Sequence, residues 1–546
     1  MPDPMEFNSR RAPILGRNGM VAASQPLAVA AGLSVLELGG NAADAAVATA
    51  AAIAVTEPTS TGLGGDCFAL YYDAATCQVT ALNGSGRAPA KLTLARLQSE
   101  GLGQELPPYH PYTVTVPGAC AGWHDLVSRY GSLPLAAIFA PAIKLAEEGF
   151  PVTPDTSYFW QHAAQGQLGR ALGGRELLID GRAPHPGEVF RNPGMVRTLQ
   201  AIAYGGKTAF YHGPIAEAIA AVVKQAGGCL SVADLAMHTS TWEQPISTTY
   251  RGIRIWECPP NGQGMAALLA LNILEGYDLA DLEPLSAGRL HLEIEAMRLA
   301  FADTRWYAAD PDFSPAPLDA LLSKAYAAER RLLINPDRVG PYRQHGTPVA
   351  SSDTVYLTVV DAQGNACSFI NSNYMGFGTG LVPAGWGFTL QNRGHNFSLQ
   401  PSHPNVLAPG KRPYHTIIPA MATRAVDDSL YASFGVMGGY MQPQGHLQVV
   451  AGLVDDGLNP QAALDRLRFC IEPEQGEGND AQVSLENGFP AETLAGLEAR
   501  GHSIRLVAGM QRSLFGRGQI IYRDPSSHVL WGGSDPRAAG CAMCLP

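Results

Sequence analysis

Three short segments of this chain hold residues whose types and spacing could support chemistry. Cys541 and Cys544 form a C-x-x-C pair, but no second ligand pair accompanies it, so neither a metal nor another cofactor is predicted. Residues 61–66, TGLGGD, are glycine-rich like a phosphate-binding loop, yet they lack the full G-x-G-x-x-G spacing and no Walker lysine follows. The third is Thr354, whose hydroxyl could attack a carbonyl carbon. By residue type alone, a threonine entering a strand is more simply a β-former.

The element that must position Thr354 is a β-strand. The segments 355–361 (VYLTVVD), 365–371 (NACSFIN) and 431–437 (YASFGVM) have strand-like patterns, and the first two are joined by an Asp-x-x-Gly-Asn turn. Strand patterns predominate after residue 354. Helical patterns predominate before it, above all in 120–150, 196–227 and 284–334. The alternation predicts a protein of the α/β class.

Composition narrows the possible partners. Hydrophobic residues make up 46% of the 546 residues and charged residues 16%, and the chain contains 60 glycines, which indicates a tightly packed globular enzyme. A balance of 37 Lys and Arg against 48 Asp and Glu gives a net charge of −11. This argues against nucleic acid and against an anionic membrane surface as partners.

The termini and the cysteines suggest where the protein works. Arg10 and Arg11 are not followed by an apolar segment, so no secretory signal is predicted. The apolar run 42–55 is shorter than the roughly 20 residues of a membrane span. Nine dispersed cysteines are more typical of reduced thiols than of a disulfide framework. We therefore expect a cytoplasmic enzyme.

The sequence from Thr354 onward, TVYLTVVDAQGNACSFINSNYMGFGTG, resembles the γ-glutamyltranspeptidase superfamily. Further segments match in the family's order, including GGNAADAAVA, TEPTSTGLGGDCF, PPNGQG and GVMGGYMQPQGH. The resemblance implies the four-layer αββα sandwich of the N-terminal-nucleophile (Ntn) hydrolases. It also implies a precursor cut into a large subunit, 1–353, and a small subunit, 354–546, which together form one structural unit.

The resemblance assigns catalytic roles as well. The precursor would break its own Asp353–Thr354 bond, which gives Thr354 a hydroxyl and a free α-amine. An α-amine has a pKa of about 8, so part of it is neutral near pH 7 and can serve as the base. Gly438 and Gly439 resemble the oxyanion-hole pair of the family, since backbone N–H groups without a Cβ can approach the substrate. Ser372 stands where the family has a hydroxyl that orients the nucleophile.

The sequence departs from the family where substrate is recognised. The family's arginine in Arg-Glu-x-Ala-Pro has only Arg87 as a counterpart, displaced by two positions, and the family's serine pair corresponds to His415 and Thr416. A glutamine and an aspartate of the family correspond to Arg393 and Asn396. An acid that would pair with an α-ammonium is thus replaced, and a cation is added. Such a change favours a plain anion over an amino acid.

These departures predict a small anionic amide as substrate. Arg393 can hold a carboxylate through two parallel hydrogen bonds, with Tyr374 as a further donor. The sequence is similar to a bacterial subgroup that contains oxamate amidohydrolase of purine catabolism, which implies hydrolysis of oxamate to oxalate and ammonia. The alternatives are a γ-glutamyl hydrolase or transpeptidase acting on glutathione-like substrates, a cephalosporin-acylase-type amidase, and a scaffold that never processes. Pairing of two processed units as a dimer of heterodimers is left open.

Overall fold

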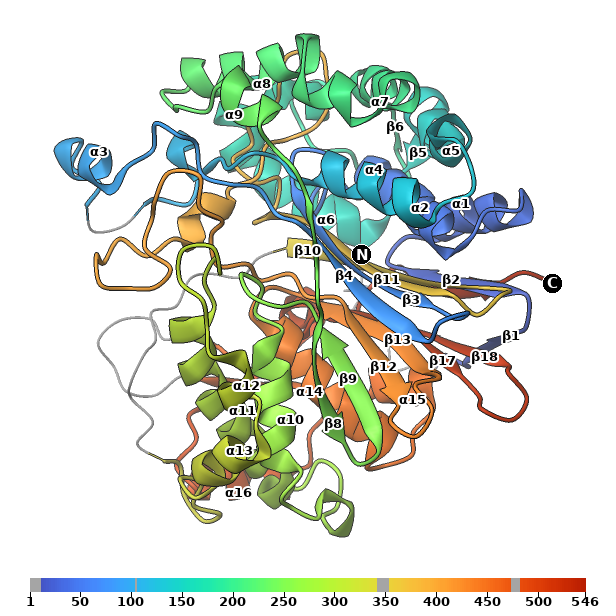
Figure 1. The fold of residues 1–546 in the computed structure, drawn as a ribbon, viewed down its shortest axis with the longest axis vertical. Helices are drawn as coiled ribbons and strands as arrows, with labels where there is room; N and C mark the ends of the chain where they lie inside the picture. Colours follow the sequence, from blue (N-terminus) through green and yellow to red (C-terminus); the bar gives the residue numbers. More distant parts are fainter. Residues whose placement is uncertain (1–10, 104–105, 341–352, 473–481) are drawn as a thin grey trace.

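The computed structural model describes residues 11–103, 106–340, 353–472 and 482–546. Its core is two antiparallel seven-stranded sheets that face each other (Figure 1). The first sheet has, in spatial order, strands β19 (Cys541–Cys544), β2 (Gly19–Ala23), β10 (Asp353–Asp361), β11 (Ala366–Tyr374), β3 (Asp66–Asp73), β4 (Gln78–Gly84) and β7 (Thr241–Glu243). The second has β1 (Ile14–Gly16), β18 (Leu530–Ser534), β17 (Arg517–Arg523), β13 (Leu430–Met437), β12 (Ala420–Arg424), β9 (Ile253–Glu257) and β8 (Ile246–Tyr250).

Helices cover the outer side of each sheet (Figure 1). Against the first sheet lie α1 (Pro26–Glu37), α2 (Ala42–Thr56) and α4 (Ala119–Tyr130). Outside them, α5 (Leu135–Glu148) packs on α2, α7 (Pro193–Tyr211) packs on α5, and α8 (Pro214–Gln225) packs on α7. Against the second lie α10 (Met265–Leu274), α14 (Met441–Val454) and α15 (Pro460–Asp465). The predicted α/β class is confirmed.

Helix α2 illustrates how the sequence builds these layers. Asn41 accepts hydrogen bonds from the N–H groups of Ala43 and Asp44, and the Asp44 carboxylate accepts one from the Asn41 N–H, which forms a capping box. Every residue of α2 is buried, and the helix packs on α1, α5 and strands β10 and β11. Small alanine side chains allow this close approach on all sides.

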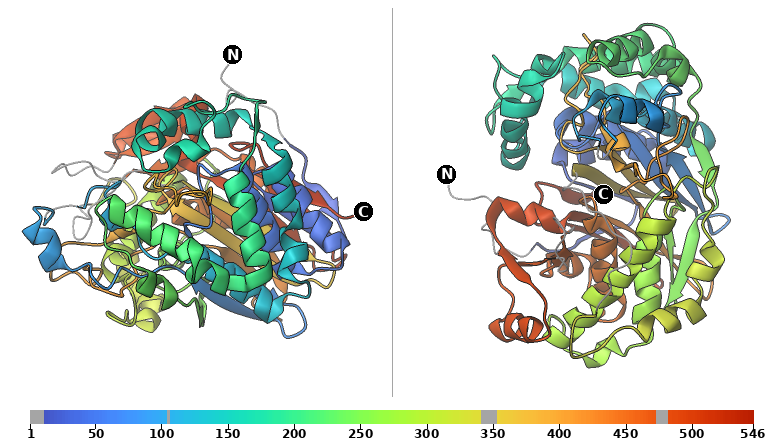
Figure 2. Two further views of the ribbon diagram at one scale, coloured as in Figure 1. Left: turned by 90° about the horizontal axis from the view of Figure 1, so that it is seen from above. Right: turned by 90° about the vertical axis from the view of Figure 1, so that its left-hand side faces the viewer.

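Segments that are distant in sequence meet at the lower end of the molecule. Helix α16 (Ala491–Ala499) packs against α11 (Ala287–Tyr307), and Figure 2 shows this red helix beside the yellow-green ones in its right-hand view. A three-stranded sheet of β14 (Phe469–Ile471), β15 (Val483–Glu486) and β16 (Ile504–Val507) lies in the same region of the sequence as α16. The chain before residue 354 and the chain after it therefore pack together in the same part of the structure.

The structure divides one predicted helical block and locates the C-x-x-C pair. The helical block 284–334 is divided into α11, α12 (Leu318–Leu321) and α13 (Lys324–Arg331), because Pro311, Pro315 and Pro317 cannot continue a helix. The C-x-x-C pair lies on the edge strand β19, where residues three apart point to opposite faces. Both cysteines are free, and their side chains leave opposite faces of the strand.

None of the helices in the described parts of the chain is long and apolar enough to cross a bilayer.

Candidate active site

Thr354 lies at the start of the central strand β10 and is fully buried. Its hydroxyl donates a hydrogen bond to the Oγ of Ser372, near the end of the neighbouring strand β11, over 3.2 Å. The pairing of the two strands shifts here, because Asp353 is opposite Tyr374 whereas Val355 is opposite Asn371. Irregularities of this kind re-aim side chains and are common beside active sites.

The contact between the sheets places Thr354 near the glycine pair. The Thr358 hydroxyl donates to Ser433 Oγ over 2.6 Å, and the Tyr356 ring packs directly on Gly435. Two residues further along each strand, β10 reaches Thr354 and β13 reaches Met437, so both lie at the same end of the facing strands. Gly438 and Gly439 follow Met437 directly. The fold therefore places Thr354 and the glycine pair at the same end of the two facing sheets.

The two glycines form a turn whose N–H groups are available. Gly438 has a φ of 134° and Gly439 a φ of 59°, which glycine adopts without strain. Their carbonyls accept hydrogen bonds from the N–H groups of Met441 and Gln442, over 3.0 and 3.2 Å. Within the described chain neither glycine N–H has a hydrogen-bond partner. Donors held in this way can stabilise negative charge on a carbonyl oxygen.

Arg393, in the short 3-10 helix η5 (Arg393–Asn396), is a fully buried cation beside Ser372. Its guanidinium donates to Ser372 Oγ over 3.1 Å and to Thr416 Oγ1 over 2.7 Å, and it lies 4.5 Å from the centre of the Tyr374 ring. Its Nε is buried without a partner among the described residues, and no carboxylate of those residues forms an ion pair with it. Burial lowers the pKa of Arg393 to about 10, so the group is still charged near pH 7.

Asp66 supplies the nearby negative charge, and the sequence analysis did not single it out. Its Oδ1 accepts hydrogen bonds from the Gly86 N–H, the Gly118 N–H and the Gln391 side chain, over 3.0, 3.0 and 2.9 Å. Burial raises the pKa of Asp66 to about 6, although Arg393 opposes the shift. Its position at the end of TGLGGD, as the first residue of strand β3, was the available signal.

His415 links Asp66 to the segment that carries Thr416. Its Nδ1 accepts the Ile417 N–H over 3.3 Å, so the proton is on Nε2, which lies 3.1 Å from Asp66 Oδ2 and donates to it. Burial and Arg393 hold the pKa of His415 well below its ordinary value, so the ring is neutral. His415 therefore orients Asp66, whereas Thr416 touches the arginine.

The glycine-rich run 61–66 packs against the site and does not form a phosphate-binding loop. A Cβ on Gly65 would meet the Ser372 carbonyl oxygen at 2.2 Å, and a Cβ on Gly64 would meet that of Thr389 at 1.9 Å. The Thr61 hydroxyl accepts a hydrogen bond from Asn371. The glycines permit this close backbone contact, which leaves no room there for a nucleotide.

Several polar atoms around Arg393 are buried without partners in the described part of the chain. They are the Tyr374 hydroxyl, Asn396 Oδ1 and His395 Nε2. The Nδ2 of Asn396 donates to the Tyr414 carbonyl over 3.1 Å, and His395 Nδ1 lies 2.6 Å from the Leu106 carbonyl oxygen. Buried polar atoms are normally paired, so unpaired ones beside a cation are suited to a polar ligand.

Arg87 is the predicted site residue that these contacts do not include. Its guanidinium donates to the Thr239 carbonyl over 3.4 Å and is partly exposed. Arg412, another buried arginine, donates to the same carbonyl over 3.5 Å. Among the described residues, no hydrogen bond or ion pair joins Arg87 to Thr354, Ser372 or Arg393.

Comparisons with known proteins place this arrangement in context. A family model described as Gamma-glutamyltranspeptidase matches residues 28–545. The glutathione hydrolase-like YwrD proenzyme of Bacillus subtilis (strain 168) is 35% identical, over 97% of this chain and 99% of its own length. The oxamate amidohydrolase proenzyme of Klebsiella pneumoniae is 33% identical, over 96% and 98%. The crystal structure of a cephalosporin acylase from Bacillus halodurans superposes with a TM-score of 0.91 at 46% identity, covering 100% and 99% of the two chains.

Proposed function

The chain belongs to the γ-glutamyltranspeptidase family of amide hydrolases, and on this premise we propose that Thr354 is its nucleophile after self-cleavage. The hydrogen bond from Thr354 to Ser372 and the free N–H groups of Gly438 and Gly439 support this assignment. The facing sheets with helices on both outer sides fit the four-layer αββα sandwich of the Ntn hydrolases. Residues 1–353 and 354–546 are then the large and small subunits.

Cleavage before Thr354 would serve two purposes. It frees the α-amine that acts as base, and it changes the surroundings of a hydroxyl that is fully buried in the continuous chain. Two of the similar proteins are named as proenzymes, which supports a cut in this chain as well.

The proposed reaction has two halves. In the first, the Thr354 hydroxyl oxygen bonds to the amide carbon while its proton passes to the α-amine, and the carbonyl oxygen takes negative charge next to the glycine N–H groups. The C–N bond then breaks. The protonated α-amine of Thr354 gives its extra proton to the departing nitrogen, which leaves as ammonia or as an amine. In the second half, water attacks the ester and releases the acid, while Thr354 recovers its proton.

The observation that carries the substrate class is the buried charge of Arg393, whose hydrogen-bond partners among the described residues are hydroxyl groups. Asp66 offsets part of this charge without a direct contact, and a carboxylate on the substrate would supply a directly bonded partner. The same arginine touches Ser372, which touches Thr354, so a carboxylate held there would lie close to the attacking hydroxyl. We therefore propose an amide whose acyl part carries a carboxylate, with oxamate as the specific candidate.

A second candidate is an acylase acting on a larger amide with a carboxylate on the acyl side. The 46% identity to a cephalosporin acylase favours it. A γ-glutamyl substrate fits less well, because Asn396 offers a neutral acceptor where an α-ammonium would need an acid.

Intact-mass analysis and ammonia release test this proposal. We expect wild-type protein to contain a fragment beginning at Thr354 and to release ammonia from oxamate, and Thr354→Ala to remain one chain without activity. Cleavage at another bond would refute the nucleophile. A fragment starting at Thr354, with no turnover of oxamate but rapid turnover of γ-glutamyl-p-nitroanilide, would refute the substrate class alone.

A further inference from the structure

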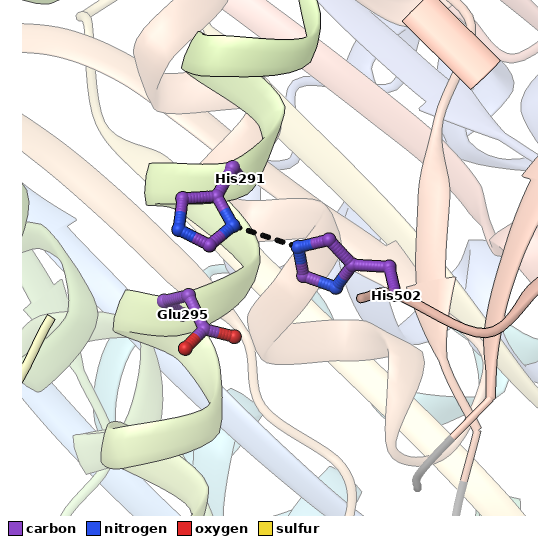
Figure 3. Close-up of side chains that lie close together, drawn as sticks. All are labelled: His291, Glu295 and His502. Atoms are coloured by element: carbon purple, nitrogen blue, oxygen red, sulfur yellow. Dashed lines mark hydrogen bonds between the residues drawn. The ribbon is translucent and has the colours of Figure 1, made fainter. Parts of the chain in front are cut away.

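Two histidines and a glutamate form a buried cluster away from the contacts around Thr354. His291 and Glu295 lie one turn apart on α11, and His502 lies between α16 and β16. Their exposed fractions are 0, 0 and 4%. One candidate ligand atom from each lies within 4.8 Å of the others. Figure 3 shows the two rings facing each other and Glu295 one turn along the helix from His291.

The His291 ring is held in the form that a metal ligand needs. Its Nε2 lies 2.7 Å from the Asn335 carbonyl oxygen and must donate to it, so its Nδ1 has a free lone pair. This Nδ1 faces His502 Nε2 at 2.8 Å (Figure 3). Metal-binding histidines commonly donate their other N–H to a backbone carbonyl, which fixes the ring in this way.

The Glu295 carboxylate is oriented as well. Arg298 donates to its Oε1 and the Gly340 N–H donates to its Oε2, each over 2.9 Å. A carboxylate oxygen has two acceptor positions, so these bonds fix the group without using its full capacity. Hydrogen bonds of this kind to ligating carboxylates are typical of metal sites.

The hydrogen bond between the rings does not satisfy His502. Its Nδ1 is buried with no hydrogen-bond partner among the described residues. Buried polar atoms are normally paired, so such an atom in a native protein calls for an explanation. When Nε2 binds a metal ion the ring proton is on Nδ1, which then needs an acceptor such as a water molecule.

We propose that His291 Nδ1, His502 Nε2 and a Glu295 oxygen bind a divalent transition-metal ion, and that the ion is Zn²⁺. Two imidazoles and a carboxylate are a donor set that zinc prefers, with water as a fourth ligand. Zn–N bonds of about 2.1 Å at a tetrahedral angle separate two nitrogens by about 3.4 Å. The two nitrogens, now 2.8 Å apart, would open by about 0.6 Å, and the Glu295 oxygen, which lies within 4.8 Å of them, would move closer.

The site connects two parts of the chain. His291 and Glu295 come before position 354 and His502 comes after it, and the partners Asn335 and Gly340 belong to the segment that leads toward Thr354. The ion would hold this segment against both α11 and the turn after α16. Metal binding does not depend on chain cleavage, but in a cleaved protein the ion would join the two fragments.

Metal content and affinity test the site on the full chain. After removal of metal with a chelator, we expect wild-type protein to take up one Zn²⁺ per chain in competition with a chromophoric chelator. His502→Gln and His291→Gln should weaken binding by at least ~100-fold, since loss of an outer partner alone costs up to about that much. His212→Gln, which alters an exposed histidine, is the matched control and should bind like wild type.

A second measurement does not rely on variants that fold. Co²⁺ bound by wild-type protein should give the intense visible bands of a tetrahedral site with nitrogen ligands, and Zn²⁺ should remove them. Equal Zn²⁺ affinity in wild type and His502→Gln would overturn the proposal. So would a Co²⁺ spectrum as weak as that of the hydrated ion.

Discussion

Arg393 is charged, buried and bonded only to hydroxyl groups among the described residues, so its charge should act mainly on substrate. We expect Arg393→Gln to lower kcat/KM for the carboxylate-bearing amide by ~10²-fold, corresponding to about 3 kcal/mol for a lost buried charge contact. Ammonia release across substrate concentrations measures it. Arg87→Gln is the control and should change kcat/KM less than about threefold, because its contact is the Thr239 carbonyl. The reverse result would make Arg87 the carboxylate ligand.

The pKa of Asp66 predicts how substrate affinity varies with pH. Asp66 becomes neutral as pH falls through about 6, and its charge then no longer competes with an anion for Arg393. KM should therefore be lower below pH 6 than above it, while kcat also falls there because the α-amine is protonated. Steady-state kinetics in a series of buffers separates the two. In Asp66→Asn, KM should stay low at every pH; a KM that still rises above pH 6 would contradict the role of Asp66.

The turn between β13 and α14 is the element that presents the two free N–H groups. Gly438 has a φ of 134°, which alanine rarely adopts, and an added Cβ would lie 3.1 Å from Gly516 Cα. We expect Gly438→Ala to lower kcat by 10²–10³-fold, about the effect of losing one oxyanion donor. Gly457→Ala is the control, because Gly457 has a φ of 63° but open space around it. Equal losses in both variants would point to general backbone strain.

Local sequence patterns predicted several of the strands. They did not predict which strands pair, because pairing depends on contacts between distant parts of the chain. Strands β10, β11 and β13 follow the sequence expectations, since alternation and turn residues act over a few positions. The pairing of β2 with β10 and β19 joins residues hundreds of positions apart, and no short pattern carries that information. The same limit hid Asp66 and the cluster around His291. The family resemblance, in contrast, directed attention to Ser372 and Arg393 before any contact was visible.

At the scale of the molecule, both sheets mix strands from before and after position 354. In the first sheet β10 lies between β2 and β11, and in the second β9 pairs with β12. After cleavage, the two fragments should thus remain together without denaturant. Light scattering coupled to size exclusion should give 57.7 kDa or a multiple of it, while a denaturing gel shows two bands. Fragments that elute separately would contradict this expectation, and a doubled mass would indicate a dimer of heterodimers.

The buried charge of Arg393 also bears on how the reaction ends. Hydrolysis of an amide that already carries one carboxylate yields a dianion, with one negative charge more than the substrate. The same guanidinium attracts that product more strongly than it attracts the starting compound. Turnover in a closed vessel should consequently slow as the diacid accumulates, and in a cell the flux through this step would depend on whichever process removes it.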